Sequence, residues 1–497
     1  MSKSDSTKNY YVTIGLEIHA ELKTATKMFC ACKNDPDETR PNVNICPVCM
    51  AHPGALPVAN KEAVRQVIRV GLAVNGTIAD FSEFDRKNYF YPDIPKGYQI
   101  SQYKYPIVSG GKLPDFDLTR IHLEEDTGNS KHDRGDFSLV DFNRAGVPLM
   151  ELVTEAHTFA PDLADDGSVV TSAAEIAAAA AARFAREYQF VLWYLGASDA
   201  NMEKGEMRVE ANISVTTDRA VFGTKVEVKN LNSVRSAERA IKFEAARMID
   251  LIEKGRASDI VQETRGWDEV KQATFSQRSK EEAQDYRYFP DPDLPKMKLH
   301  ELFDLNALRA ELPELPEAKR ARYRADFGIK DEDIESYIAD IGLGRLFEDG
   351  VRAIDDEANK KALITLYSNY LTNDYVKFKS DNPDAKIPNH IMFAKLIKML
   401  HEGKLSSRAA KDILPVMINE EKDPEIIASE QGLMQQSDEG ALKSIAEKVI
   451  ADNPAVVETY KGGKENALMS LVGIIMRETK GSANPQLVQK ILKDLLQ

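Results

Sequence analysis

The chain has 497 residues, of which 43% are hydrophobic and 29% charged, and its formal net charge is −14 at pH 7. This length exceeds one ordinary core, so about two to four domains are expected, and no apolar run is long enough to span a membrane. The acidity excludes a generic polyanion binder, because counterion release needs clustered Lys and Arg, so any contact with nucleic acid must use local basic patches. The start MSKSDSTKNYY has no hydrophobic segment, so no secretory signal and a cytoplasmic location are expected.

Residues 12–22, VTIGLEIHAEL, alternate between apolar and polar side chains, which predicts a β-strand with one face on a core. The other face carries Glu17, His19 and Glu21 in a row. This face is either solvated, as one side of an antiparallel sheet commonly is, or it binds a divalent cation. Carboxylate oxygens suit Mg²⁺ and a neutral imidazole can join them, but one strand does not decide between the two interpretations.

All four cysteines of the chain lie between residues 30 and 49, as a C-x-C followed by a C-x-x-C. This spacing is typical of a zinc ribbon or knuckle and predicts a structural Zn²⁺ site formed by Cys30, Cys32, Cys46 and Cys49. Disulfides are less expected in a chain without a signal peptide, and free or redox-active thiols are the remaining alternative. Four thiolates fill the coordination shell, so this metal would stabilise the loop and would not catalyse.

The stretch 84–106, FDRKNYFYPDIPKGYQISQYKYP, places aromatic residues among Arg86, Lys87, Lys96 and Lys104. Such a stretch is either a buried aromatic cluster or a surface on which nucleotides stack. The two interpretations stay equally open.

Further strand-type segments carry glutamates: RIHLEEDTGNS (120–130), PLMELVTE (148–155), RVEANISV (208–215) and VEVKNLNS (226–233). Alternation in the first of them places Arg120, His122, Glu124 and Asp126 on one side and Glu125 on the other. The other segments contribute Glu151, Glu210 and Glu227, the last together with Lys229. If these strands converge in one sheet, their like charges repel one another unless a cation lies among them, which favours an Mg²⁺ site for phosphoryl chemistry.

Several nucleophile and phosphate-binding motifs are absent from the chain. There is no G-x-x-x-x-G-K-[ST] loop, no G-x-S-x-G elbow and no cysteine outside the predicted zinc site. A built-in hydrolase or glutaminase nucleophile is therefore not expected. If the reaction uses ammonia, another chain would supply it.

The pattern changes from strands to helices after DYRYFPDPDLPK (285–296), so a domain boundary is expected near residue 296. Before it, the Ala-rich run 173–195 predicts a long helix. After it, EEKDPEIIASEQGL (420–433) is predicted to be a linker that leads into a small terminal helical bundle. The fold class is α+β, with domains at 1–296, 297–425 and 426–497.

From residue 12 to its C-terminus the chain resembles the B subunits of the aspartyl/glutamyl-tRNA(Asn/Gln) amidotransferases. The segments that carry the resemblance are VTIGLEIHAELKT, CPVCMAHPGALPVAN, FDRKNYFYPDIPKGYQISQ, RIHLEEDTGNS, GVPLMELVTE, EANISV, KVEVKNLNS and DYRYFPDPD. The resemblance implies that residues 1–296 form a cradle domain with an antiparallel sheet, similar in fold to the catalytic domain of glutamine synthetase and guanido kinases. A helical domain and a tail domain that contacts tRNA would follow.

The resemblance also implies an activity. Family members use ATP and Mg²⁺ to phosphorylate the side-chain carboxylate of Glu mischarged on tRNA(Gln), or of Asp on tRNA(Asn). Ammonia that a partner amidase A subunit releases from glutamine then displaces the phosphate, and a small C subunit completes a heterotrimer. The enzyme is a ligase that forms carbon–nitrogen bonds, and its cofactors would be ATP, Mg²⁺ and structural Zn²⁺.

The family's magnesium motif matches Glu17, His19, Glu125 and Glu151, and Glu210 stands where the family commonly has Asp. Because a metal-bound imidazole must be neutral, activity is expected to fall at acidic pH. The family's zinc site matches the four cysteines.

The resemblance further implies catalytic roles for Glu125, Lys87, Glu227 and Lys229. Lys87 would lie where the ammonia channel opens, close to Glu125, and Glu227 and Lys229 would face the same cavity. In the tail, the candidates for phosphate contacts are Lys461, Lys464, Arg477 and Lys480, and a solvated helix face is the alternative for each of them.

Two rivals stay open on the sequence alone. One is a non-enzymatic scaffold that binds tRNA without phosphoryl transfer. The other is a ligase that joins ammonia to a small-molecule carboxylate. The sequence does not decide which mischarged tRNA is used.

Overall fold

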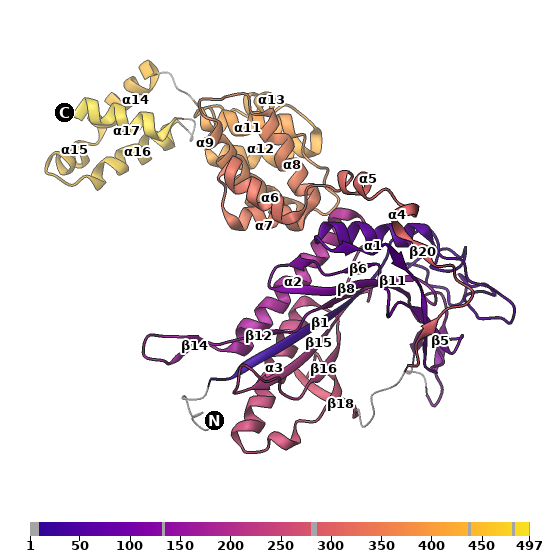
Figure 1. The fold of residues 1–497 in the computed structure, drawn as a ribbon. Coiled ribbons are helices and arrows are strands. Elements are labelled where there is room, and N and C mark those ends of the chain that lie inside the picture. The colour runs from indigo at the N-terminus through magenta and orange to yellow at the C-terminus, as the bar shows by residue number, and fades with distance from the viewer. Residues whose placement is uncertain (1–8, 132–134, 280–285, 436–438, 480–482, 497) are drawn as a thin grey trace. The chain divides into compact units, whose positions relative to one another are not determined.

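The structure, a computed structural model, describes residues 9–131, 135–279, 286–435, 439–479 and 483–496. Contacts between residues divide the chain into two compact units, Met1–Pro316 and Glu317–Gln497. The first unit contains a large sheet with long helices, and the elements of the second are helices (Figure 1). Among the described residues, no helix is both long and apolar enough to cross a membrane.

The first unit is built on an 11-stranded sheet whose main path runs β18–β17–β16–β15–β1–β11–β8–β6–β2. Its central strands are β15 (Met207–Thr216), β1 (Tyr11–Glu21), β11 (Pro148–Thr154) and β8 (Phe116–Glu125). Towards the edges lie β18 (Ala273–Ser279), β17 (Glu263–Asp268), β16 (Val226–Leu231), β6 (Val108–Ser109) and β2 (Thr77–Ile78). The strand predicted over 12–22 is therefore confirmed as β1, in the middle of the sheet.

The sheet is mixed, whereas an antiparallel sheet was expected. β16 and β17 run parallel, with Glu227 opposite Thr264. A parallel pair needs a crossover, which α3 (Val234–Glu253) provides between the two strands. The antiparallel prediction is wrong at this edge, because alternation along a strand reveals its buried face but not the direction of its neighbour.

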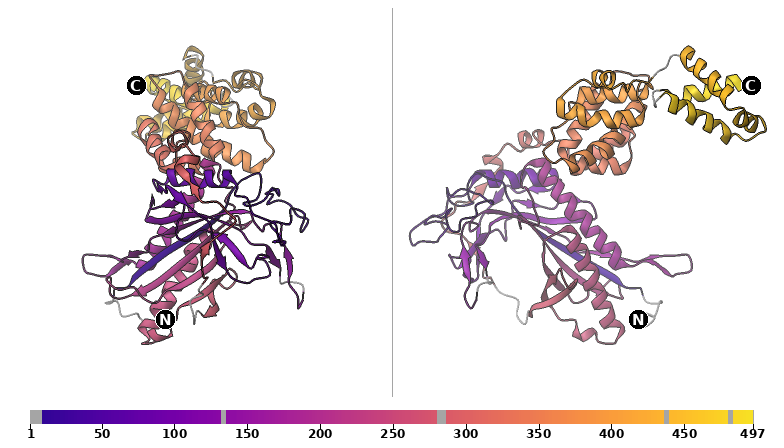
Figure 2. Two further views of the ribbon diagram at one scale, coloured as in Figure 1. Left: turned by 45° about the vertical axis from the view of Figure 1, so that its right-hand side comes forward. Right: turned by 180° about the vertical axis from the view of Figure 1, so that it is seen from behind.

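One face of the sheet packs on α3 and α2 (Ala173–Leu195), the helix predicted from the Ala-rich run (Figure 2). Alternate residues of β1 from Val12 to Ala20 are buried in this core. α2 begins with a capping box of Ser172 and Glu175, which satisfies backbone donors that the first helical turn leaves free. Because apolar side chains fill this face, the polar residues of the same strands lie on the opposite face.

A small sheet of β4 (Asp85–Asn88), β5 (Tyr98–Ser101) and β19 (Phe289–Pro290) contains much of the aromatic stretch 84–106. The aromatic side chains divide between two environments. Phe84 is buried, whereas Phe90 is 80% and Tyr103 is 62% exposed. Neither a buried cluster nor a stacking surface therefore describes the whole stretch.

The second unit is helical and includes α7 (Asp331–Ala339), α8 (Ile341–Ala353), α9 (Lys360–Asn369), α11 (His390–His401) and α12 (Ser407–Glu420). Residues 420–433 are not a plain linker, because they contain α13 (Pro424–Glu430). Asp423 caps this helix, Pro424 occupies its first turn, and Ile427 and Ala428 are buried. The prediction missed α13 because the helix has only seven residues, too few to show a helical repeat of apolar positions.

The C-terminal helices are α14 (Glu439–Asp452), α15 (Pro454–Lys461), α16 (Asn466–Glu478) and α17 (Pro485–Leu496). Buried residues of α14, α16 and α17, such as Leu442, Leu471 and Leu492, form a hydrophobic core of their own. The terminal bundle that the sequence predicted thus has the apolar core that such a bundle needs.

Candidate functional site

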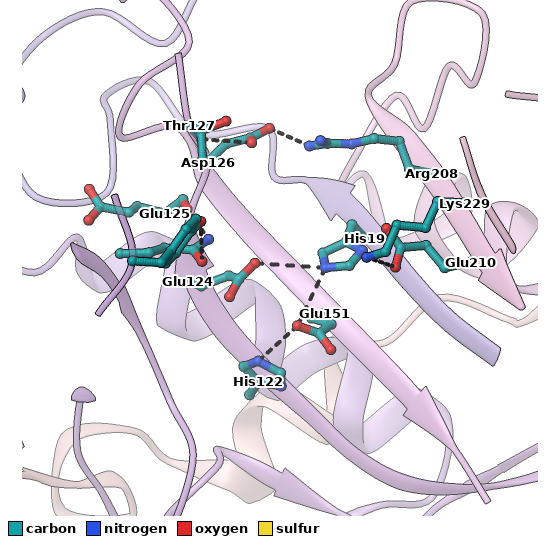
Figure 3. A network of polar contacts seen from close by, with 12 residues as sticks. His19, His122, Glu124, Glu125, Asp126, Thr127, Glu151, Arg208, Glu210 and Lys229 are labelled. Carbon is teal, nitrogen blue, oxygen red and sulfur yellow. Dashed lines mark hydrogen bonds and ion pairs between the residues drawn. The ribbon is translucent and has the colours of Figure 1, made fainter. Parts of the chain in front are cut away.

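The polar face of the central strands carries a row of ionisable side chains (Figure 3). His122 of β8 lies opposite Glu151 of β11, and Glu151 lies opposite His19 of β1. His19 in turn lies opposite Arg208 of β15. Cross-strand partners point to the same side of a sheet and stand about 5 Å apart, so the register alone brings these side chains together.

Around His19 the row forms a group that we call the histidine site: His19, Glu124 and Glu151. His19 Nε2 lies 3.4 Å from Glu151 Oε2 and 3.8 Å from Glu124 Oε1. One ligand atom from each residue lies within 4.8 Å of those of the other two. His122 also contacts this group, since its Nε2 lies 3.2 Å from Glu151 Oε2. One nitrogen and several carboxylate oxygens from three strands can hold one cation.

The electrostatics of the histidine site follow from its burial. Burial alone would lower the pKa of His19, but the nearby Glu151, Glu210 and Glu124 carboxylates raise it to about 9. Burial would likewise raise the pKa of Glu151, but His122 and His19 hold it well below its usual range. Without a metal, a proton on His19 therefore offsets part of the negative charge, as a bound cation would.

A second group, which we call the glutamate site, consists of Glu17, Glu210 and Glu227, whose ligand atoms also lie within 4.8 Å of one another. Lys229 Nζ lies 2.7 Å from Glu210 Oε2 and 3.1 Å from Glu227 Oε1. Asn212 donates to Glu17 Oε1 over 2.9 Å. Burial, with the charge of the nearby Glu151, raises the pKa of Glu17. Here an ammonium group already lies between two of the three carboxylates.

The structure does not bring Glu125 to either site. Its carboxylate forms an ion pair with Lys96 and accepts a hydrogen bond from the backbone N–H of Ile100 over 2.9 Å. Glu124, its neighbour on β8, lies beside His19 instead. Resemblance had assigned this role to Glu125, whereas the alternation of 120–126 had already placed Glu124 and His122 on one side of the strand. That alternation was the signal that could have found Glu124.

Lys87, predicted to lie close to Glu125, lies on β4 with its ammonium 5.0 Å from the centre of the Tyr286 ring. Burial would lower the pKa of Lys87, but the Glu124 and Glu151 carboxylates, among other groups, raise it. The charge of Lys87 therefore acts on the histidine site.

The four cysteines come together as the spacing predicted. The sulfur atoms of Cys30, Cys32, Cys46 and Cys49 all lie within 4.8 Å of one another. A hydrogen bond with Cys30, together with the Lys27 ammonium, lowers the pKa of the Cys49 thiol to about 5. Four sulfurs at this separation, one of them readily ionised, fit the tetrahedral sulfur shell of a structural zinc ion.

The basic residues predicted in the tail lie on the surface of the C-terminal helices. Lys461 ends α15, Lys464 follows it, and Arg477 lies in the last turn of α16, and all three are exposed. Lys480 lies outside the described residues. Exposure alone is compatible with both phosphate contacts and a solvated face.

Comparison with known proteins matches residues 12–303 to the family described as GatB/GatE catalytic domain and residues 345–496 to the family described as GatB domain. The chain is 41% identical to a curated protein of Thermotoga maritima and 40% identical to one of Carboxydothermus hydrogenoformans. Each alignment covers 98% of this chain and 99% of the relative. A protein of Thermoanaerobacter pseudethanolicus is 41% identical over 499 residues. All three relatives are named as the B subunit of an aspartyl/glutamyl-tRNA(Asn/Gln) amidotransferase.

Proposed function

Because the chain belongs to the family of aspartyl/glutamyl-tRNA(Asn/Gln) amidotransferase B subunits, we propose that it carries out the ATP- and Mg²⁺-dependent activation step of tRNA-linked amidation. The side-chain carboxylate of Glu on tRNA(Gln), or of Asp on tRNA(Asn), receives a phosphoryl group from ATP. Ammonia from a partner A subunit then displaces the phosphate and leaves the amide. With a small C subunit the assembly is a glutamine-hydrolysing ligase that forms carbon–nitrogen bonds.

The observation that carries this proposal is that the histidine site and the glutamate site, two clusters rich in carboxylates, lie on one face of the sheet. The histidine site also fits a metal by its donor set, and Glu124 Oε2 is buried with no hydrogen-bond partner among the described residues. A cation bound there offsets the negative charge where ATP and a carboxylate meet. Glu17, Glu210 and Glu227 are the proposed ligands of a second cation, with Glu210 the residue that departs from the family's usual Asp.

The remaining site residues have proposed roles that do not require them to bind metal. Lys229 acts at the glutamate site, where its ammonium offsets the charge of Glu210 and of the catalytic candidate Glu227. Lys87 acts on the histidine site through its charge. Glu125, paired with Lys96, keeps the role that the resemblance implies, near the point where ammonia reaches the cavity.

The same family membership supports the architectural part of the proposal. Residues 1–296 would form the catalytic cradle, similar in fold to glutamine synthetase and guanido kinases, followed by a helical domain over 297–425 and a tail over 426–497. The tail would contact tRNA through Lys461, Lys464 and Arg477, whose exposed charges suit phosphate contacts.

The affinity of the histidine site for a divalent cation is expected to rise with pH. Below about 9, His19 carries a proton that the metal must displace, so the apparent affinity should rise roughly tenfold per pH unit up to that value. Titration of the full chain with Mn²⁺ between pH 6 and about 9, followed by electron paramagnetic resonance, measures this slope. A slope of zero would show that His19 does not exchange its proton for the metal.

The function is tested by reconstituting the chain with A and C partners, ATP, Mg²⁺ and each mischarged tRNA in turn, and by following the amide product. We expect amidation with glutamine or with free ammonia, and no product without ATP. Free glutamate in place of the charged tRNA separates the small-molecule ligase, which alone would turn it over. A complex that binds charged tRNA but forms no amide under any of these conditions would be a scaffold.

A further inference from the structure

A third polar cluster continues the same face of the sheet beyond the histidine site (Figure 3). Asp126 follows the end of β8 and forms an ion pair with Arg208 of β15, although β11 and β1 lie between these strands. Arg144 also contacts Asp126, with its Nε 3.6 Å from Asp126 Oδ2. None of these three residues belongs to either candidate metal group.

The side chain of Asp126 is buried and held in place by several contacts. Its side chain is 2% exposed, and the backbone N–H of Thr127 donates to its Oδ1 over 2.8 Å. Its Oδ2 contacts the guanidinium groups of both Arg208 and Arg144. Arg144 is fixed too, because it donates to the carbonyl oxygens of Thr127 and Gly128, each over 3.0 Å.

Arg208, unlike Arg144, has a buried nitrogen donor that lacks a partner in the described part of the chain. Its Nη2 contacts Asp126, while its buried Nε has no hydrogen-bond partner among the described residues. The side chain is 30% exposed, and Arg208 is the direct cross-strand partner of His19. Lys229, by contrast, already contacts two carboxylates of the glutamate site. Arg208 is thus a cation beside the histidine site that retains hydrogen-bonding capacity.

A buried ion pair is weak grounds for a stabilising role, because the cost of removing two charges from water can exceed their attraction. A role that better fits such a pair is that the carboxylate holds the guanidinium in one orientation. A guanidinium fork matches phosphate geometry and forms charge-assisted hydrogen bonds with phosphoryl oxygens.

We propose that Arg208 binds a phosphoryl oxygen next to the histidine site and that Asp126 is the residue that positions its guanidinium. This inference rests on the proposed function. The phosphoryl group belongs either to the nucleotide or to the tRNA end, and the two sources are separated by experiment. Only binding is involved, so no bond is formed or broken by Arg208.

The test compares Arg208→Lys and Asp126→Asn in the assembled amidotransferase. Lys keeps the positive charge but loses the fork, so we expect the KM of one phosphate-bearing substrate to rise about 10- to 100-fold. Asp126→Asn should give a smaller rise in the same KM, and the double variant should be no worse than Arg208→Lys alone. Arg183→Lys is the matched control, because Arg183 is an exposed residue of α2 that pairs with Asp115, and it should leave both KM values unchanged.

The readouts also identify the source of the phosphate. A rise confined to ATP, with weaker binding of Mg-ADP by calorimetry, assigns the nucleotide, and a rise confined to charged tRNA assigns the RNA. Unchanged KM values and unchanged Mg-ADP binding in Arg208→Lys would overturn the proposal, as would a lower melting temperature with no change in either constant. Mg-ADP binding needs no amidation, so failure of the proposed function remains distinguishable from failure of this inference.

Discussion

Replacing Glu151 by Gln is expected to reduce amidation at least about 100-fold while the chain stays folded. Glu151 lies between His19 and His122, at 3.4 and 3.2 Å, and is the residue that joins these two imidazoles. Gln has the same shape and keeps hydrogen-bonding atoms, but it removes the negative charge that attracts a cation and raises the pKa of His19. The loss should therefore appear as weaker metal binding and slower chemistry, since a cation site with one carboxylate fewer holds Mg²⁺ poorly.

The measurement is single-turnover amidation over a range of Mg²⁺ concentrations, together with Mn²⁺ binding by electron paramagnetic resonance. Glu155→Gln is the matched control, because Glu155 directly follows the strand that carries Glu151, is exposed, and accepts a hydrogen bond from the Thr119 hydroxyl of β8. It should behave as the unmodified chain. Amidation by Glu151→Gln within a few-fold of the control would remove the histidine site from the mechanism.

Removing zinc, either with a chelator or by Cys49→Ser, is expected to unfold the loop between residues 30 and 49. The sulfur atoms of the four cysteines lie within 4.8 Å of one another, and bringing four thiolates this close without a metal is unfavourable because of their mutual repulsion. Structural zinc sites in small domains contribute on the order of 10 kcal/mol. The loss here should be local, because no residue between 30 and 49 belongs to the hydrophobic core formed around β1 and α2.

Metal analysis should give about one zinc per chain before treatment, and limited proteolysis should cut within 30–49 after it. Val48→Ser alters the same C-x-x-C turn without removing a thiol and should retain the metal. A chain that contains no zinc, with thiols that oxidise reversibly and a loop that resists protease, would instead support the redox alternative.

Alternation was the most reliable signal in the sequence, and it located both the core and much of the site. It predicted β1 from residues 12–22 and, through 120–126, the shared side of His122 and Glu124. It could not state which strands are neighbours, so the register that places Glu151 opposite His19 became visible only in the structure. The sequence pattern also failed to predict α13, a short helix with three buried residues.

The Glu124–Glu125 pair shows why a shared motif does not by itself place a ligand. Adjacent residues of a strand point to opposite faces, so a shift of one position exchanges a contact with His19 for a contact with Lys96. A sequence motif contains both glutamates and does not say which of them faces the site, whereas the pleat of the strand places their side chains on opposite faces. The Arg208–Asp126 pair escaped prediction for a different reason: Arg208 is on β15 and Asp126 directly follows β8, and two other strands lie between β15 and β8.

The central strand makes assembly of the catalytic face inseparable from folding. In β1 the residues that fill the hydrophobic core alternate one by one with the polar residues proposed to bind a cation. Sliding the strand by a single position would therefore send Glu17 and His19 into the apolar core and Ile18 into water. Such a misaligned molecule would be too unstable to persist. Correct folding of β1 therefore also places the site residues correctly. An insertion or deletion of one residue within this strand should be poorly tolerated, even where the inserted side chain makes no unfavourable contact.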